Sequence, residues 1–369
     1  MAAHSSPWPC TAQPSGGKRP VAVLGATGAV GQAFVRLLAD HPWFELTEVA
    51  ASERSASKTY GEAARWLGTD PMPETVAKKT VRACDPREIS AGIVFSALDS
   101  SVAGEVEAEF ARDGKIVLSN AKNYRMEPDV PLVIAEVNPD HLRVLDAQRR
   151  RRGWSGGIVT NGNCSTIVAA LTLAPLHEKF GVAEVFLFTM QAVSGAGYPG
   201  VASLDILGNV IPYIKEEEEK VESELQKFLG TATHDAIASA SIKVSAHCNR
   251  VPVENGHTIC ISVRLRDRAS VDEVSQALRE WQGAEAARGL PSSPAQPIVL
   301  APAPDRPQPR RDVARGGGMT VTVGRVRPDA LFDVKLVAMG DNIVRGAAGA
   351  SVLNAELMAN CGMLPAPAP

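Results

Sequence analysis

The 369-residue sequence lacks several features that would assign it to a particular class of protein. No apolar run approaches the roughly 20 residues that a membrane-spanning helix needs, so we expect no membrane partner. The formal net charge of -3 gives no basic excess, and we expect no nucleic-acid partner. None of the six cysteines forms a CxxC pair, so the sequence predicts no metal site. A composition of 45% hydrophobic and 21% charged residues is typical of a globular protein, and the chain is long enough for two domains.

The N-terminal segment also lacks a targeting signal of the secretory type. Residues 1–19 contain no acidic residue, are rich in Ser, Pro and Gly, and have no apolar core of signal-peptide length. We predict a disordered tail over residues 1–19, with a short organellar transit segment as the alternative. The cysteine spacings, which suggest no small disulfide framework, predict a reducing, cytoplasmic location.

The first half of the chain alternates between strand-like and helix-like patterns. This alternation predicts a parallel, doubly wound sheet of the Rossmann type, and therefore an α/β fold. The predicted elements are strands at Val21–Leu24, Thr47–Ser52, Gly92–Leu98, Lys115–Asn120 and Leu132–Val137, and helices at Val30–Leu38 and Val102–Arg112.

The second half carries long apolar strand-like segments in series. They predict an α+β domain whose mostly antiparallel sheet is covered on one face by helices. The segments are Val182–Val193, Ala236–His247, His257–Arg266, Met319–Val326 and Leu331–Met339. Between them, residues 283–318 are rich in Pro, Arg and Gly and predict a long connection without structure, of the kind that is usually functional. The last segment predicts a helix with Leu353 and Leu357 one turn apart.

A glycine-rich turn follows the first predicted strand. Gly25, Gly28 and Gly31 have a GxxGxxG spacing between a strand and a helix. Glycines at such a turn let the backbone approach a pyrophosphate, which binds at the positive end of the helix. The context favours a dinucleotide site over a turn without a ligand.

The loop after the second predicted strand favours NADP over NAD. An acidic residue that would bind the NAD ribose is missing from the strand end. Ser52, Arg54, Ser55 and Lys58 instead offer hydroxyls and positive charge to a ribose 2′-phosphate, although Glu53 lies among them.

Cys164 stands at a predicted helix start. Ser165 and Thr166 are suited to cap a helix over the apolar run that follows. The partial positive charge of a helix N-terminus lowers the pKa of a thiol and favours the thiolate. Free cysteines are commonly inert packing residues, so the local sequence leaves both interpretations open.

Polar residues in later loops suit substrate binding and proton transfer. Arg250 and His257 lie between two predicted strands. Arginine binds carboxylates in a bidentate manner, and histidine transfers protons near neutral pH. Gln191 ends a predicted strand before a glycine-rich loop, where its amide could orient a substrate. The acidic run at 215–224 is, by default, a solvated helix face.

Seven motifs together resemble the aspartate-semialdehyde dehydrogenases, in particular their archaeal and fungal branch. They occur in the same order between about residues 20 and 364. The motifs are GATGAVGQ, SNAKNYRM, NGNCSTI, QAVSGAGYPG, NRVPVENGHT, DRPQPRRD and GDNIVRGAAG.

The resemblance implies an NADP-binding domain over residues 20–160 and a catalytic and dimerisation domain over 161–340. A C-terminal helix over 341–364 would return to the first domain. It also implies NADPH-dependent reductive dephosphorylation of L-4-aspartyl phosphate to L-aspartate 4-semialdehyde through a cysteine thioester. This step leads to lysine, threonine, methionine and isoleucine. The implied partners are the small-molecule substrate, phosphate and further copies in a homodimer or homotetramer.

The resemblance also assigns residues. Cys164 would be the nucleophile and His257 the acid/base, and the cofactor would be NADP. The substrate-binding positions would be Arg250, Gln191, Glu217, Lys220, Asn120 and Arg125, with the Glu217–Lys220 register uncertain among four consecutive glutamates. The cofactor-binding positions would be Gly25, Thr27, Gly28, Ala29, Val30, Gly31, Ser52, Arg54, Ser55, Ser96 and Asn342. Gly162 departs from the family, where Ser or Pro is commoner.

Three alternatives stay open at this point. Malonyl-CoA reductase would use the same cysteine and histidine on a thioester. N-acetylglutamyl-phosphate reductase follows similar logic but matches fewer motifs. A non-catalytic NADP-binding protein is the third, and a reactive Cys164 would argue against it.

Overall fold

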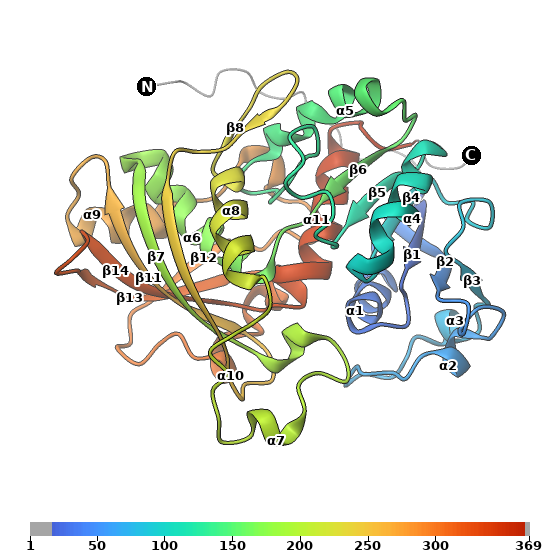
Figure 1. Ribbon diagram of the computed structural model, residues 1–369, viewed down its shortest axis with the longest axis horizontal. Helices are drawn as coiled ribbons and strands as arrows, with labels where there is room; N and C mark the ends of the chain where they lie inside the picture. Colours follow the sequence, from blue (N-terminus) through green and yellow to red (C-terminus); the bar gives the residue numbers. More distant parts are fainter. Residues whose placement is uncertain (1–16, 366–369) are drawn as a thin grey trace.

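The N-terminal half forms a six-stranded parallel sheet with helices packed around it (Figure 1). The computed structural model describes residues 17–365. Strand order is β3-β2-β1-β4-β5-β6, the doubly wound order, with its switch point between β1 and β4. The strands are β1 (Arg19–Leu24), β2 (Phe44–Ala51), β3 (Val81–Ala83), β4 (Ile93–Ser96), β5 (Ile116–Ser119) and β6 (Gly157–Thr160). The helices are α1 (Ala29–Leu38), α2 (Tyr60–Ala63), α3 (Glu74–Ala77), α4 (Ser100–Arg112), η1 (Pro139–Val144) and α5 (Leu145–Arg152).

The turn between β1 and α1 needs glycine at two positions. Gly25 has a φ of +70°, and a Cβ there would lie 2.6 Å from the Ala97 carbonyl oxygen. At Gly31 a Cβ would lie 2.2 Å from the Gly25 carbonyl oxygen. Any side chain at either position would push the helix away from the strand. The turn therefore places the start of α1 directly at the carboxyl end of β1.

The predicted strand at Leu132–Val137 is wrong. Only an isolated bridge joins Leu132 to Thr160, and the segment around it turns rather than extends. The sixth strand is β6, whose four residues are all buried. A run of apolar residues signals burial, and by itself it does not distinguish a strand from a buried turn.

The second sheet has the order β10-β7-β11-β14-β13-β12 and is mixed (Figure 1). The three central pairs are antiparallel, as predicted, but the outer pairs β10–β7 and β12–β13 are parallel. Its strands are β7 (Val182–Gln191), β10 (Lys243–Arg250), β11 (His257–Leu265), β12 (Ile298–Ala301), β13 (Val321–Pro328) and β14 (Val334–Gly340). The helices α6 (Cys164–Phe180), α8 (Glu217–Phe228) and α9 (Val271–Glu280) pack against it and share its apolar core.

Two further expectations for this half need correction. The predicted strand at 236–247 is split, because β9 (Ile237–Ala238) pairs with β8 (Thr231–Ala232) in a separate hairpin. The connection 283–318 is not without structure. It contains η3 (Glu285–Ala287), α10 (Pro309–Asp312), η4 (Arg315–Gly318) and the edge strand β12. The remaining elements are η2 (Val193–Ala196) and α7 (Ser203–Ile206).

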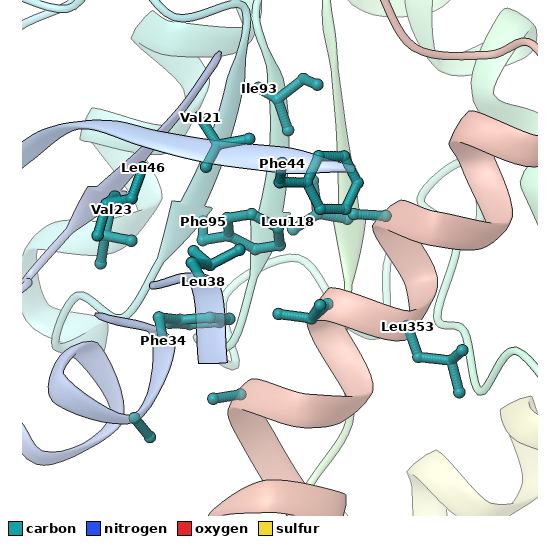
Figure 2. Packing of buried hydrophobic residues seen from close by; sticks show 14 of the residues in the cluster. Val21, Val23, Phe34, Leu38, Phe44, Leu46, Ile93, Phe95, Leu118 and Leu353 are labelled. Atoms are coloured by element: carbon teal, nitrogen blue, oxygen red, sulfur yellow. The ribbon is translucent and has the colours of Figure 1, made fainter. Parts of the chain in front are cut away.

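The last helix of the chain packs into the core of the first sheet. From β14 the chain enters η5, a π-helix over Val344–Ala348, and then α11 (Gly349–Asn360), a helix whose residues are buried almost throughout. Figure 2 shows α11, the helix that carries Leu353, beside the strands that carry Phe95 and Leu118, and all three residues belong to one apolar cluster. The sequence predicts a tail over residues 1–19. Of these, residues 1–16 lie outside the described residues, and β1 begins at Arg19. Among residues 17–365, no helix is long and apolar enough to cross a membrane.

Candidate active site

Cys164 is the first residue of α6, and its neighbour Asn163 caps that helix. The Asn163 Oδ1 atom accepts hydrogen bonds from the backbone N–H groups of Ser165 and Thr166, at 3.0 and 3.1 Å. The predicted capping by Ser165 and Thr166 is therefore wrong, since these residues supply the donors rather than the acceptor. The helix N-terminus nevertheless lies where the sequence indicated.

A histidine from another strand faces the thiol. His257 begins β11, and its Nε2 atom lies 3.1 Å from the Cys164 Sγ atom. The other ring nitrogen, Nδ1, accepts a hydrogen bond from the Ala192 backbone N–H at 3.1 Å. The histidine side chain is fully buried. The structure thus brings together the two residues assigned to catalysis, 93 positions apart in the chain.

Burial keeps this pair neutral. Burial is the main cause that raises the pKa of the Cys164 thiol to about 12, and the nearby Glu217 carboxylate is the second. The guanidinium groups of Arg250 and Arg125 act in the opposite direction but are outweighed. Burial, followed by Arg250, lowers the pKa of His257 to about 3. This direction is opposite to the one expected from the helix N-terminus alone, because burial disfavours the charged thiolate.

Arg250 and Gln191 lie side by side at the ends of two parallel strands. They are register partners in β10 and β7, and both are buried. The Arg250 Nη1 atom donates to the Ala192 carbonyl at 2.8 Å, and Arg250 lies close enough to Cys164 to affect its charge. The Gln191 amide instead donates to the Thr189 hydroxyl at 3.3 Å and does not line the cleft beside the thiol.

Helix α8 presents two carboxylates to the thiol region. Glu217 accepts a hydrogen bond from the Asn163 side chain at 2.7 Å, and its other oxygen lies 3.7 Å from the Lys220 ammonium. This is the register predicted for the pair. Glu224 was not predicted. It accepts from the Asn163 backbone N–H at 2.5 Å and from the Arg125 guanidinium at 2.9 Å. Its signal in the sequence is the seven-residue spacing from Glu217, which places both on one helix face.

A cleft of about 310 Å³ opens beside Cys164, and its lining includes three cationic side chains. Lys122, Arg125 and Lys220 supply the positive charge. The Arg125 Nη2 atom donates to the Asn120 carbonyl at 2.7 Å, while its buried Nε atom has no hydrogen-bond partner among residues 17–365. Asn120 follows β5 and also lines the cleft. Such a group of donors suits an anion with several oxygens.

The start of α1 reaches the same cleft. Ala29 and Val30 line it, and Gly28 caps the helix without a side chain. The first turn of α1 contains no acidic residue, so its N–H groups are available to a phosphate. The glycine turn therefore fits a dinucleotide pyrophosphate. Thr27, which is also predicted to bind the cofactor, is only part-exposed.

The other cofactor positions differ in their surroundings. Ser52 and Arg54 are exposed in the loop after β2, with Ser55 part-buried beside them. Ser96, at the end of β4, is fully buried and does not line the cleft. Asn342 lines the cleft, but its amide is already engaged. It accepts from the Gly256 backbone N–H and donates to the Ser194 hydroxyl, both at 2.8 Å, and so joins two loops.

One contact involves the glycine-rich loop that lines part of the cleft. The Arg65 guanidinium lies over the Tyr198 ring, 4.9 Å from its centroid. Arg65 follows α2 beside the first sheet, whereas Tyr198 belongs to the glycine-rich loop after β7, which lines the cleft through Gly195 and Gly197. The contact therefore joins the two halves of the chain. Gly346 of the π-helix lies against the Cα and Cβ atoms of Cys164.

The chain matches known proteins over most of its length. The family described as semialdehyde dehydrogenase, NAD binding domain matches residues 20–145, and the family described as semialdehyde dehydrogenase, dimerisation domain matches residues 173–345. The aspartate-semialdehyde dehydrogenase of Archaeoglobus fulgidus is 52% identical, over 92% of this chain and 97% of that protein. The Schizosaccharomyces pombe enzyme of that name is 46% identical, over 93% and 99%.

A solved structure gives the same result. The crystal structure of the Candida albicans aspartate semialdehyde dehydrogenase with NADP superimposes with a TM-score of 0.87 at 44% identity. The match covers 94% of this chain and all of that one. Identity at this level, over nearly the full length of each relative, establishes membership as well as fold. The chain belongs to the aspartate-semialdehyde dehydrogenase family.

Proposed function

We propose that the protein catalyses the NADPH-dependent reductive dephosphorylation of L-4-aspartyl phosphate to L-aspartate 4-semialdehyde, in the aspartate pathway of amino-acid biosynthesis. One observation carries the proposal: the Cys164–His257 pair lies at a cleft that also contains cationic side chains and the start of the nucleotide-binding helix. A thiol, an anion site and a dinucleotide turn are the three parts that this reaction needs. No feature of the described residues favours malonyl-CoA reductase over this reaction.

Covalent catalysis at sulfur divides the reaction into two steps. The Cys164 sulfur attacks the acyl carbon, phosphate leaves and a thioester forms. Bound NADPH then supplies the hydride that reduces the thioester to the aldehyde. We assign the acid/base role to His257, because its Nε2 atom lies 3.1 Å from the Cys164 Sγ atom.

The charged residues divide between the two ends of the substrate. Arg250 would bind the α-carboxylate, since its guanidinium lies near the thiol but apart from the cationic cleft. Lys220, Arg125 and Asn120 would hold the leaving phosphate in the cleft. Glu217 would orient Lys220 and the cap of α6. Gln191 would orient the substrate only after its side-chain amide breaks the hydrogen bond to the Thr189 hydroxyl.

The test is the reverse reaction, with aspartate semialdehyde, phosphate and NADP as substrates. We expect NADPH formation that requires phosphate and is abolished in Cys164→Ala, while NADP binding is retained. Cys248→Ala is the matched control, because Cys248 is a buried thiol on β10 outside the cleft. Activity without phosphate, or substantial turnover by Cys164→Ala, would refute the assignment.

Cofactor preference tests the loop after β2. Arg54 is exposed and free to approach a 2′-phosphate. We expect Arg54→Ala to raise the KM for NADP and to leave that for NAD nearly unchanged. Equal changes in both KM values would show that the loop does not read the 2′-phosphate.

One face of β7 in the dimerisation domain carries a row of partly exposed apolar side chains. Phe186, Phe188 and Met190 alternate on this face of β7, and Phe188 is 38% exposed. We propose that a second copy packs here to form a homodimer, with a homotetramer as its possible further assembly. Sedimentation analysis of wild type and Phe188→Glu measures this. A dimer that persists in Phe188→Glu places the interface elsewhere.

A cytoplasmic location is part of the proposal. Cys164 must stay reduced to act as a nucleophile, and the cytosol maintains thiols in that form. Cell fractionation with an antibody to the protein tests the location directly, and recovery in an oxidising compartment would contradict it.

A further inference from the structure

Four charged residues form one row along a face of α8. They are separated by three, four and three positions, the spacing of neighbours on a helix face: Glu217, Lys220, Glu224 and Lys227. Glu217, Glu224 and Lys227 are buried, with exposed fractions of 6%, 2% and 2%. A buried charge costs free energy unless it is paired or hydrogen-bonded. Each of these side chains must therefore find its partners within the fold.

Lys227 meets the segment 120–130, which follows β5 and carries Arg125. Its Nζ atom donates to three backbone carbonyls of that segment, those of Arg125, Glu127 and Val130, at 2.6, 2.7 and 2.9 Å. An ammonium group has three N–H donors, whereas a neutral amine has only two. The three carbonyls thus use every donor of the charged form. If the ammonium lost its proton, one carbonyl would lose its partner.

The same helix also holds the side chain of Arg125. The guanidinium donates to the Glu224 carboxylate at 2.9 Å and to the Asn120 carbonyl at 2.7 Å. Because Lys227 binds the Arg125 carbonyl, α8 fixes both the backbone and the side chain of this residue. Lys220, one turn before Glu224, lines the cleft directly. One face of one helix thus supports both cations that we assign to the leaving phosphate.

The groups that act on the charge of Lys227 come from the segment itself, from α8 and from η1. They are three carboxylates and one imidazole: Glu127, Asp129, Glu224 and His141. Each carboxylate is already paired with an arginine side chain. Burial outweighs their effect and lowers the pKa of the Lys227 ammonium to about 8. The ammonium is therefore charged at neutral pH and loses its proton in the mildly alkaline range.

We propose that Lys227 is a positioning residue of the phosphate site, whose ammonium holds the backbone of Arg125 where the guanidinium reaches the leaving phosphate. The inference deepens the proposed function and rests on it. Lys227 does not line the cleft, so it acts through Arg125 and not on the substrate. Glu224 completes the arrangement, because it also accepts from the Asn163 N–H at the start of the helix that carries the thiol.

Phosphate affinity separates positioning from general support of the fold. In Lys227→Met the side chain keeps its length but offers no donor to the three carbonyls. We expect the KM for phosphate in the reverse reaction to rise about 10–100-fold, the change produced by losing a hydrogen bond to a charged group, while the KM for NADP stays within about twofold. An unchanged KM for phosphate in folded Lys227→Met would overturn the proposal.

Lys115→Met is the matched control. Lys115 is a buried lysine just before β5 whose ammonium donates to the Pro86 carbonyl at 3.1 Å, and it does not line the cleft. We expect this variant to lose stability in urea denaturation without a change in the KM for phosphate. A rise in that KM as large as in Lys227→Met would show that any buried lysine has this effect, and would overturn the specific role of Lys227.

A double variant shows whether Lys227 acts through Arg125. If it does, Lys227→Met has no further effect on phosphate affinity once Arg125 has been replaced. We expect Arg125→Gln and Arg125→Gln/Lys227→Met to have the same KM for phosphate within about twofold. Two independent supports would instead multiply their effects on KM. Multiplied effects would therefore contradict the positioning role.

The pH dependence of the wild type tests the ammonium without a substitution, and so applies even where Lys227→Met does not fold. The charged form is present below a pKa of about 8 and is lost above it. We expect the KM for phosphate to rise as pH increases through about 8, while the KM for NADP stays constant. Lys227→Arg should lack this rise, because a guanidinium keeps its charge. A KM for phosphate that is flat in the wild type between about pH 7 and 10 would refute the role of the ammonium.

Direct binding distinguishes a failure of this proposal from a failure of the proposed reaction. Equilibrium dialysis with radiolabelled phosphate in the presence of NADP needs no turnover. Weaker phosphate binding by Lys227→Met than by Lys115→Met, in a protein without phosphate-dependent activity, would refute the reaction and leave the positioning role in place. Equal phosphate binding by the two variants of an active enzyme would refute the positioning role and leave the reaction in place.

Discussion

A fully buried ion pair connects the π-helix behind the thiol to the first domain, and breaking it should be costly. The Arg345 guanidinium meets the Glu136 carboxylate in two hydrogen bonds of 2.6 and 3.1 Å, with side-chain exposures of 0% and 1%. A third donor, Nε, reaches the Met319 carbonyl at 2.6 Å. In Glu136→Gln the guanidinium stays buried without a counter-charge. We expect this to lower the free energy of unfolding by about 3–5 kcal/mol.

A double variant isolates the cause. When both partners are replaced by methionine, no uncompensated charge remains and the volume is nearly kept. We expect the Glu136→Met/Arg345→Met protein to lie within about 1–2 kcal/mol of wild type, because the pair's attraction mainly offsets its own desolvation. Since a domain is stable by only about 5–15 kcal/mol, the single variant should lose a large part of that margin.

The measurement is urea denaturation followed by tryptophan fluorescence, at one fixed protein concentration because oligomers gain stability with concentration. The activity of each variant is measured alongside, since η5 lies against Cys164. If Glu136→Gln loses less than about 1 kcal/mol, or if the double variant is as unstable as the single one, the reasoning from buried charge is wrong.

Three further predictions concern the site and its supports. In Gly346→Ala the new Cβ would lie 2.5 Å from the Cys164 Cβ, so we expect kcat/KM to fall about 10²-fold through a misplaced thiol; an unchanged rate would contradict this. Burial raises the pKa of the Glu107 carboxyl group to about 7, above the value of about 4.3 in the unfolded chain. The stability that this carboxyl group contributes is therefore fully present below about pH 4 and is lost as pH rises through 7. Glu107→Gln should therefore be more stable than wild type at pH 8 by on the order of 2–4 kcal/mol but not at pH 4, as measured by denaturation at each pH. Tyr198→Ala and Arg65→Ala should each weaken NADPH binding about 2–5-fold in a fluorescence titration, while Tyr198→Phe keeps the ring and the affinity.

The parts of the fold that could be predicted are those with local signals. The glycines of the β1–α1 turn are required by backbone contacts within a few residues, so their spacing alone indicates the turn. The start of α6 at Cys164 was located correctly because polar residues precede an apolar run. By contrast, Leu132–Val137 was predicted as a strand because apolar composition does not specify pairing, and pairing depends on distant residues.

The site was predictable in its members but not in its electrostatics. Cys164, His257 and Arg250 could be named from their motifs, yet their protonation depends on burial by segments that come from the whole chain. Glu224 was missed because its role requires the contact with Arg125, 99 residues away. Ser96 was assigned to the cofactor from its motif, and the structure shows that it is buried together with all the other residues of β4.

The position of α11 has a consequence for how the chain is made. The helix supplies Leu353 and Leu357 to the same core as β1 and α1, although more than 300 residues separate them. During synthesis the first sheet therefore emerges from the ribosome long before the helix that completes its core. Part of the apolar surface of the nucleotide-binding half therefore stays uncovered until the catalytic half has been translated. The core of the domain that begins the chain can therefore be completed only after the catalytic half has been translated.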